Sequence, residues 1–232
     1  MQQLTLFFYI AFTLGVYALV RFLYVRSKNN PLFNIVAVSA AIIIAVLLAC
    51  GITCEQYEPA KDIMTILLGP ATVGLGLPLY RYRKLLRQQA GCIAMCVAGG
   101  ALLAMFSAAL IAQWGGLPHD VVMSIMVKGV SIPFAIEITG MYGGIPPLAA
   151  AFVVATGTFG SLVGSWFLTR VGVANPLGRG LALGTVSHAQ GTAVALMEGE
   201  EQGAMAGLAM ILAGIFTAAF APPVVWVLQL LS

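Results

Sequence analysis

Charged residues are scarce in this chain of 232 residues, of which Asp, Glu, Lys and Arg together make up 8%. About a quarter of an average soluble domain is charged. Hydrophobic residues reach 60%, and a soluble globule of this size could not cover its surface with so few charges. The composition therefore excludes a soluble enzyme, a nucleic-acid-binding protein and a disordered chain. It leaves a polytopic membrane protein with at most roughly eight spans of about 20 residues.

Metal-ligating residues are also few, with four cysteines and two histidines. The cysteines form two pairs with i,i+4 spacing, Cys50/Cys54 and Cys92/Cys96, and no histidine accompanies either pair. A zinc site needs three or four convergent ligands, and a disulfide across one helical turn fits poorly. We therefore expect small apolar side chains in helices, with no metal and no other cofactor.

The first half of the chain contains four long apolar runs, at 4–20, 32–50, 63–80 and 90–112. Lys and Arg follow the first and third runs, whereas the 51–61 segment between the second and third carries Glu55, Glu58 and a single Lys61. Basic loops stay on the cytoplasmic side. We therefore expect four helices within 1–115, an N-terminus outside the cell, and no cleavable signal peptide, because no basic segment precedes the first apolar run.

The second half of the chain contains two clear spans, 145–168 and 204–231, and two interrupted segments, 121–139 and 181–197. If 121–139 crossed the membrane fully, Arg170 and Arg179 would lie outside, against the positive-inside rule. We favour two hairpins that enter from opposite faces, an arrangement typical of inverted-repeat transporters. The sequence thus predicts an all-α polytopic protein of about five to eight transmembrane helices, forming one integral membrane domain over 1–232.

Ionisable residues inside apolar segments mark the first candidate site, because each costs at least about 2.5 kcal/mol at membrane depth. Lys128 and Glu137 flank Pro133, a helix-breaking residue. Irregular backbone at this depth lines a cavity or packs in protein. Lys128 is therefore a candidate ligand for a carboxylate, and Glu137 a candidate proton or cation site. A structural Lys128–Glu137 pair and snorkelling of Lys128 to the interface remain open alternatives.

The second candidate site is the polar stretch GTVSHAQGT at 184–192, in a segment otherwise rich in small apolar residues. Backbone amides at a broken helix attract anions, and a histidine can carry a transported proton. The alternative is close helix packing through small and hydroxyl residues. The candidate ligands here are Thr185, Ser187, His188, Gln190 and Thr192, with helix breaks at Gly184 and Gly191 and, in a third discontinuous element over 68–78, at Gly69 and Pro70.

Catalysis is not indicated. Ser187 and His188 are sequence neighbours, and no carboxylate is evidently placed to orient the histidine, as a nucleophile–base pair would require. We therefore expect a protein that is not an enzyme.

Five blocks of the sequence together resemble the LrgB/CidB family. They are NPLFNIVAVS (30–39), LLGPATVGLGLPLYRYRKLL (67–86), the K-x-V-x-x-P-x-A pattern at 128–135, GGIPPLAAAFVVATG (143–157) and RGLALGTVSHAQGTAVALMEGEEQGAMAGLAM (179–210). The last block is the most specific, since it combines a GTxSHAxGTA core with an acidic turn and a small-residue helix. The resemblance covers most of the chain.

The resemblance implies a multi-pass protein of the bacterial inner (plasma) membrane. Members are linked to murein hydrolase export, autolysis and programmed cell death, and are paired with a smaller LrgA/CidA-type membrane protein. A plastid relative moves glycolate and glycerate, and bacterial members have been tied to pyruvate. By position, the family's polar blocks fall on Lys128, Ser131 and Pro133, and on Thr185, Ser187, His188, Gly191 and Thr192. Two hydroxyl residues usual in the first block are replaced by Gly129 and Ile132, and Glu137 is added.

Two functional hypotheses follow. The first is a carrier of small monocarboxylates, coupled to protons through His188 or Glu137. The second is a holin- or antiholin-like oligomeric pore, or a regulator of murein hydrolase export; an ion channel is a weaker third reading. The expected partners are a small monocarboxylate, the lipid bilayer, an LrgA/CidA-type protein and a second copy of the chain, which the small-residue face 203–214 could contact. Nucleic acid is not expected as a partner.

Overall fold

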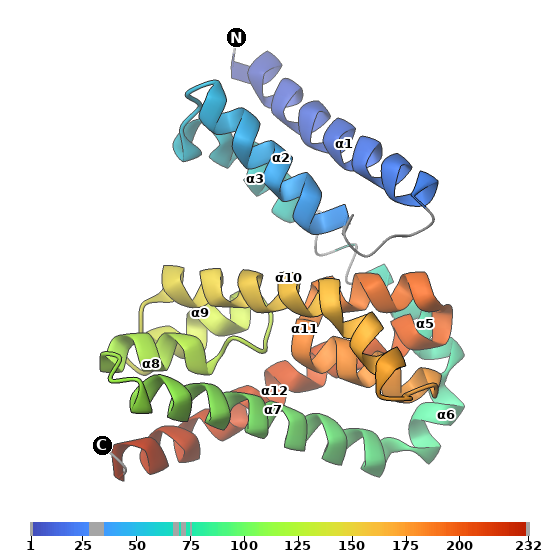
Figure 1. Ribbon diagram of the computed structural model, residues 1–232, viewed down its shortest axis with the longest axis vertical. Helices are drawn as coiled ribbons and strands as arrows, with labels where there is room; N and C mark the ends of the chain where they lie inside the picture. The colour runs from blue at the N-terminus through green and yellow to red at the C-terminus, as the bar shows by residue number, and fades with distance from the viewer. Residues whose placement is uncertain (1, 28–34, 67–69, 71–72, 75, 231–232) are drawn as a thin grey trace. The chain divides into compact units, whose positions relative to one another are not determined.

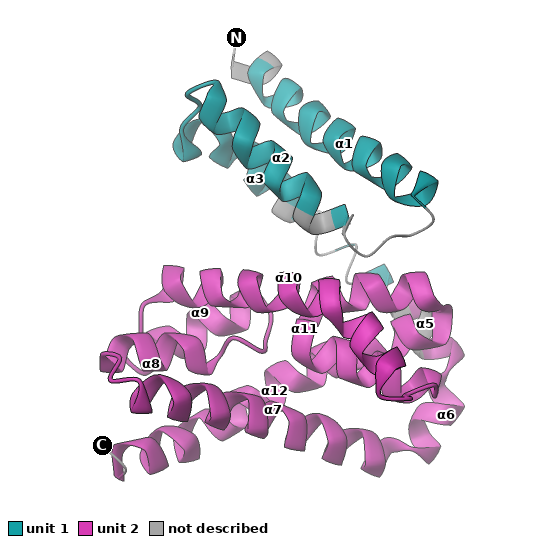
Figure 2. Ribbon diagram, in the orientation of Figure 1, with its two compact units in different colours: residues 1–76 teal, residues 77–232 magenta. Residues whose placement is uncertain are grey.

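The computed structural model describes residues 2–27, 35–66, 70, 73–74 and 76–230. It divides into two compact units, residues 1–76 and 77–232 (Figure 2), and each is described by itself. Within the described ranges all regular structure is α-helical (Figure 1), which confirms the predicted fold class. That both units form one integral membrane domain stays a prediction.

The first unit consists of α1 (Gln2–Arg26), α2 (Ile35–Ala49) and α3 (Cys54–Ile66). Its small core contains Val16 and Val20 of α1 and Ile35 of α2. The hydroxyl groups of Thr13 and Tyr57 lie 2.7 Å apart and join α1 to α3. A polar contact of this kind fixes which faces of the two helices meet.

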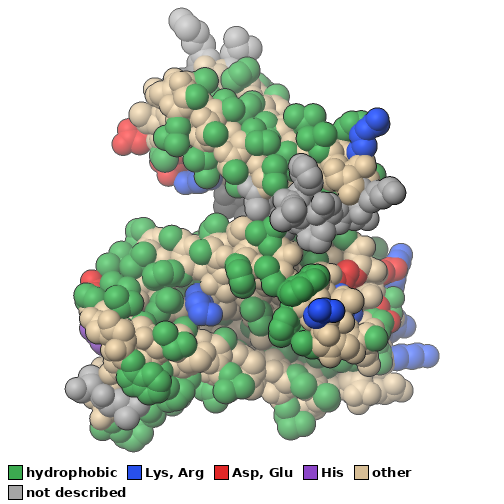
Figure 3. All heavy atoms as spheres, viewed as in Figure 1, with side chains coloured by type: hydrophobic (Ala, Val, Ile, Leu, Met, Phe, Trp, Pro, Cys, Tyr) green, Lys and Arg blue, Asp and Glu red, His purple; other side chains and the backbone are tan. Residues whose placement is uncertain are grey.

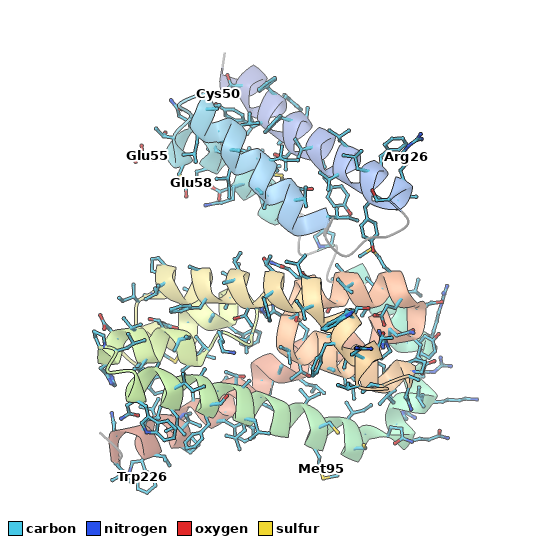
Figure 4. The ribbon with its side chains drawn as sticks, viewed as in Figure 1. Arg26, Cys50, Glu55, Glu58, Met95 and Trp226 are labelled. Atoms are coloured by element: carbon cyan, nitrogen blue, oxygen red, sulfur yellow. The ribbon has the colours of Figure 1, made fainter. Side chains whose placement is uncertain are left out.

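The acidic segment expected as a loop over 51–61 is helical from Cys54 onward. Thr53 and Gln56 explain where the helix begins. The Thr53 amide donates to Gln56 Oε1 at 3.1 Å, and the Gln56 amide donates to Thr53 Oγ1 at 3.4 Å. This reciprocal pair is a capping box, which satisfies two amides at a helix start. Glu55 and Glu58 extend outward from this helix (Figure 4).

The second unit contains the remaining helices, whose bounds are α5 (Gly76–Arg81, which begins at the boundary between the units), α6 (Arg83–Gln88), α7 (Ala90–Trp114), α8 (His119–Met126), α9 (Ile132–Met141), α10 (Pro146–Arg170), α11 (Pro176–Glu198) and α12 (Glu200–Leu230). Among the described residues, four helices are long and apolar enough to cross a membrane: 5–26, α7, α10 and α12. Shorter apolar helices cover Val38–Ala49 and Ile132–Met141. The protein is therefore a multi-pass membrane protein.

Many apolar side chains lie on the face of the second unit seen in Figure 3. Met95 of α7 and Trp226 of α12 point outward (Figure 4) and are 73% and 63% exposed. Such a surface is suited to lipid rather than to water, since monomeric soluble proteins rarely expose large contiguous apolar patches.

Three long helices form the frame of this unit. The side-chain amide of Gln113, near the end of α7, donates to the carbonyl of Leu228 near the end of α12 at 3.2 Å. Ile93 at the start of α7 shares a cluster with Met205 at the start of α12. α7 and α12 therefore run parallel, and α10 runs antiparallel to both (Figure 1).

A first helical hairpin is formed by α8 and α9, joined by the non-helical residues 127–131. Ser124 of α8 accepts a hydrogen bond from the Ile145 amide at 2.8 Å, just beyond the end of α9. The two arms are about 12 and 15 Å long at 1.5 Å per residue. Since the hydrocarbon core is about 30 Å thick, neither arm could cross it alone, as predicted for 121–139.

A second helical hairpin is α11, which reverses direction at His188 (φ 41°, ψ −124°). Arg179 and Glu198, at the two ends of α11, form an ion pair at 2.7 Å, so the arms lie side by side. A Cβ on Gly191 would meet the carbonyl of Leu183 in the opposite arm. The hairpin predicted for 181–197 is therefore present.

The helix break lies at His188 and not at Gly184 or Gly191, where we expected it. Gly191 instead lets the two arms of α11 approach each other, and Gly184 lets the first arm approach the backbone of Ala206 in α12. Both glycines lie inside helical arms because they are needed for close packing, not for the turn.

The small-residue face at 203–214 is used within the chain. Its small residues Gly203, Ala204, Ala206, Gly207, Ala209, Ala213 and Gly214 are buried, and α12 packs most extensively on α11 and α7. The expectation that this face contacts a second copy or a partner protein is wrong, since only Ile211 in it is exposed.

Candidate functional site

The breaks of the two hairpins meet inside the second unit. The imidazole of His188 faces the backbone carbonyls of Lys128, in the first break, and of Val153 in α10. The Lys128 side chain is close enough to the ring for their charges to interact. Two sequence-predicted sites, 60 residues apart along the chain by number, thus belong to one place in the fold.

The middle of α7 borders both breaks. A Cβ on Gly100 would lie 3.2 Å from the methyl group of Thr185, and a Cβ on Gly129 would lie 3.9 Å from Ala104. Gly100 and Ala104 are one helical turn apart and so share a face of α7. The site is therefore formed where α7, α10 and the two hairpin tips converge.

Polar side chains at the α11 break are buried: Thr185, Ser187, His188 and Thr192. Thr192 Oγ1 donates to the His188 carbonyl at 2.8 Å, which satisfies a backbone acceptor near the break in the helical ladder. Two buried atoms at this break, His188 Nε2 and Gln190 Oε1, have no hydrogen-bond partner. Because buried polar atoms are normally paired, these two indicate a place that receives a proton or a polar ligand.

Lys128 is unusual among the basic residues of the second unit. All the others lie at one end of it, near the starts of α7, α11 and α12 and the end of α10: Arg81, Arg83, Lys84, Arg87, Arg170 and Arg179. Lys128 is partly buried in the first break, away from that end. Within the part of the chain that the structure describes, no carboxylate pairs with its ammonium group.

Five other predicted site residues belong to segments other than α11. Ser131 immediately precedes α9 and makes no side-chain capping bond, while Pro133 lies in the first turn of α9 and starts that helix rather than breaking it. Glu137 is exposed on α9 and does not pair with Lys128 among the described residues. Pro70 is exposed, and Gly69 lies outside the described residues.

The base of the second hairpin contains a cluster that sequence reasoning missed. Arg179 donates from Nε and Nη2 to the two Glu198 carboxylate oxygens at 2.7 and 2.8 Å. Its remaining donors reach the Val173 carbonyl at 2.9 Å, the Ser165 carbonyl at 3.1 Å and Thr169 Oγ1 at 3.2 Å. We call Arg179, Glu198 and Ser165 the hairpin clasp.

The hairpin clasp borders an open cavity of about 520 Å³, but its arginine is not available to a ligand. A guanidinium has five N–H donors, and each faces a protein acceptor here. The hydrogen bond from Arg179 lowers the pKa of the Glu198 carboxyl, and burial opposes this. The same bond raises the pKa of Arg179. The hairpin clasp therefore ties the two arms of α11 to α10.

The chemistry that the two breaks can support is ion and proton binding. An ammonium, an imidazole and a side-chain amide converge with hydroxyl groups, and no carboxylate of the described residues pairs with the ammonium. Such a set suits a small anion. No group of three or more His, Cys, Asp or Glu placed to hold a metal ion occurs among the described residues.

Comparison with known proteins assigns the chain to a family. The model of the LrgB-like family matches residues 13–227. The uncharacterized protein YwbG of Bacillus subtilis is 34% identical over 85% of this chain and 86% of its own length. The holin-like protein CidB of Staphylococcus epidermidis is 30% identical (84% and 85%), and the antiholin-like protein LrgB of Bacillus cereus is 29% identical (95% and 96%). No solved structure matches. The chain belongs to the LrgB-like family.

Proposed function

We propose that this protein is a carrier of small monocarboxylates of the pyruvate, glycolate and glycerate class. The observation that supports it most is the position of Lys128. Its ammonium has no carboxylate partner among the described residues and is close enough to His188 for their charges to interact, where two half-length hairpins meet. An unpaired charge at membrane depth is too costly to be retained without a counter-ion, and a carboxylate substrate would supply one.

The hydrogen-bonding groups near Lys128 fit the rest of such a substrate. Ser187, Gln190 and Thr192 lie at the second break, with Thr185 one turn earlier and Ser131 at the first. A 2-hydroxy or 2-oxo group needs one donor or acceptor beyond the carboxylate contact. His188 Nε2 and Gln190 Oε1, which are buried without partners, are suited to that role.

His188 is the favoured proton carrier for coupling transport to a proton gradient. Histidine changes charge near physiological pH more readily than other side chains, and this one is buried beside the proposed anion site. Glu137 is the weaker candidate for coupling, because it is exposed on α9 and not paired with Lys128.

The distribution of charge supports an orientation in the membrane. The end of the second unit that carries six Lys and Arg residues would face the cytoplasm under the positive-inside rule. The second hairpin then enters from the cytoplasm and the first from outside. Together with the basic residues that follow α1, this supports an N-terminus outside the inner membrane of a bacterium.

Uptake of labelled pyruvate, glycolate and glycerate into proteoliposomes, with and without a pH gradient, tests the proposal. We expect saturable uptake that Lys128→Ala and His188→Ala abolish while the folded yield is unchanged. Lys84→Ala, which removes an exposed ammonium from α6, is the matched control and should transport normally. Saturable uptake that survives Lys128→Ala would refute the assigned site.

The names of the CidB and LrgB relatives favour a second function. Holin-like and antiholin-like proteins suggest an oligomeric pore, or a regulator of murein hydrolase export that acts with an LrgA/CidA-type partner. A pore predicts size-graded leakage of inert dyes from vesicles, without saturation and without sensitivity to His188→Ala. Carrier activity and control of autolysis are compatible, since movement of an organic acid changes pH on both sides of the membrane.

A further inference from the structure

Two glycines of α10 lie directly against the break of the second hairpin. A Cβ on Gly157 would lie 2.5 Å from His188 Cε1 and 3.3 Å from His188 Nδ1. A Cβ on Gly160 would overlap Ser187 Oγ. Both glycines are therefore required by the position of a site residue, and we call the pair the glycine seat.

The backbone of His188 is held in a conformation that a non-glycine residue rarely adopts. Its φ of 41° makes it the only non-glycine residue with positive φ among the described residues. Such outliers persist only where surrounding contacts determine them, and they cluster at functional sites. Here the contacts are the Thr192 hydroxyl on the His188 carbonyl, Gly157 against the His188 ring and Gly160 against the neighbouring Ser187.

We propose that Gly157 and Gly160 are positioning residues, which place the His188 imidazole and the Ser187 hydroxyl at the meeting point of the two hairpins. The proposal deepens the proposed function and rests on it, because it assigns these two glycines to the same site. Without the seat, a methyl group at position 157 would displace the ring away from α10. The ring would then leave the carbonyls of Lys128 and Val153 that it now faces.

Close packing of helices alone does not account for the glycine seat. Gly164 lies on α10 beside the first arm of α11, and a Cβ there would meet only a terminal methyl group of Leu183, at 2.8 Å. That side chain can rotate away. Gly99 of α7 has no neighbour within 4 Å of such a Cβ. Gly164→Ala and Gly99→Ala are therefore matched controls, and alanine is the better helix former at all four positions.

The test compares these four variants in the full chain, reconstituted in liposomes. For Gly157→Ala we expect the KM for labelled pyruvate to rise by up to about 100-fold, the effect that a misplacement of about 1 Å can have. The pH profile of uptake should also shift. Gly164→Ala and Gly99→Ala should keep the wild-type KM and profile. An unchanged KM and pH profile in both Gly157→Ala and Gly160→Ala would overturn the proposal.

A second readout is independent of transport. In a His119→Gln background, the ring signals of His188 can be followed by NMR in detergent, and we expect Gly157→Ala to shift them and Gly164→Ala to leave them unchanged. The melting temperature of Gly157→Ala should be lower than that of the wild type. The melting temperature of the double variant Gly157→Ala/His188→Ala should match that of His188→Ala alone, because removal of the ring removes the clash. If the double variant were still destabilised relative to His188→Ala, the proposed contact between Gly157 and the His188 ring would be contradicted. If wild-type protein failed to transport while these shifts appeared, the proposed substrate would be wrong and the seat would stand.

Discussion

Arg179 and Glu198 are nineteen positions apart and form a bidentate ion pair, with Arg179 Nε 2.7 Å from Glu198 Oε2 and Nη2 2.8 Å from Oε1. In a straight helix they would be about 28 Å apart at 1.5 Å per residue. Their contact follows from the reversal at His188, and it closes the open end of the second hairpin.

Removal of either partner of this pair should destabilise the protein. The side chains are only 11% and 16% exposed, and breaking a buried pair costs about 3–5 kcal/mol because one charge is left unpaired. We expect about 3 kcal/mol for Arg179→Ala and for Glu198→Ala, and less than the sum for the double variant. Denaturation in detergent measures this.

The control for that prediction is the Arg81–Glu200 pair, whose side chains are 59% and 46% exposed. Exposed ion pairs contribute about 0–1 kcal/mol, so Arg81→Ala should change stability little. Equal effects at the two pairs would contradict a special role of the hairpin clasp.

The hairpin clasp should also make stability depend on pH in the acid range. Arg179 lowers the pKa of Glu198 below its ordinary value of 4.5. A carboxyl with a lowered folded-state pKa adds stability above its unfolded pKa and loses it as pH falls through the folded pKa. Arg179 and Ser165 are the groups that face this carboxyl.

We therefore expect the melting temperature of the wild type to decrease as the pH falls below about 4.5, the range set by this lowered pKa. Glu198→Gln should be less stable at neutral pH and should lose less on acidification. Glu200→Gln, which changes an exposed carboxyl on α12, should show the same dependence of melting temperature on pH as the wild type. If the melting temperatures of the wild type and Glu198→Gln decreased in parallel on acidification, the Glu198 carboxyl would not be the cause of the acid destabilisation.

Much of this fold follows from the sequence, because long apolar runs predict the long helices and basic flanks favour an orientation for them. The half-length hairpins were predictable for the same reason, since Arg170 and Arg179 would otherwise lie outside. The hairpin clasp was not predictable, because it depends on a reversal at His188 that glycine positions suggested elsewhere. The helix α3 could have been found from the Thr53 and Gln56 capping signal, which the acidic composition of the segment obscured.

Replacement of His188 by glycine should separate backbone strain from side-chain function. Glycine adopts positive φ without steric cost, whereas alanine keeps the strain of about 1–3 kcal/mol that such a conformation stores. Both variants lose the imidazole. We expect His188→Gly to be about 1 kcal/mol more stable than His188→Ala, with neither transporting substrate.

Thermal unfolding of the two His188 variants in the same detergent checks this difference. A suitable control is Val186, an exposed residue inside the first arm of α11, where the Gly variant should be about 1 kcal/mol less stable than the Ala variant, the opposite order. Equal stability of His188→Gly and His188→Ala would mean that the turn at His188 is unstrained.

The opposite entry of the two hairpins predicts which loops reagents reach from each side. Met141, at the end of α9, is 73% exposed, and Ala174, between α10 and α11, is exposed at the other end of the unit. In a variant lacking the four native cysteines, Met141→Cys should react with an impermeant thiol reagent in intact cells. Ala174→Cys should react only after permeabilisation, because the basic end of the unit stays in the cytoplasm. Labelling of Ala174→Cys but not of Met141→Cys in intact cells would contradict a first hairpin that returns to the face it entered, because a full crossing of 121–139 would place Met141 inside and Ala174 outside.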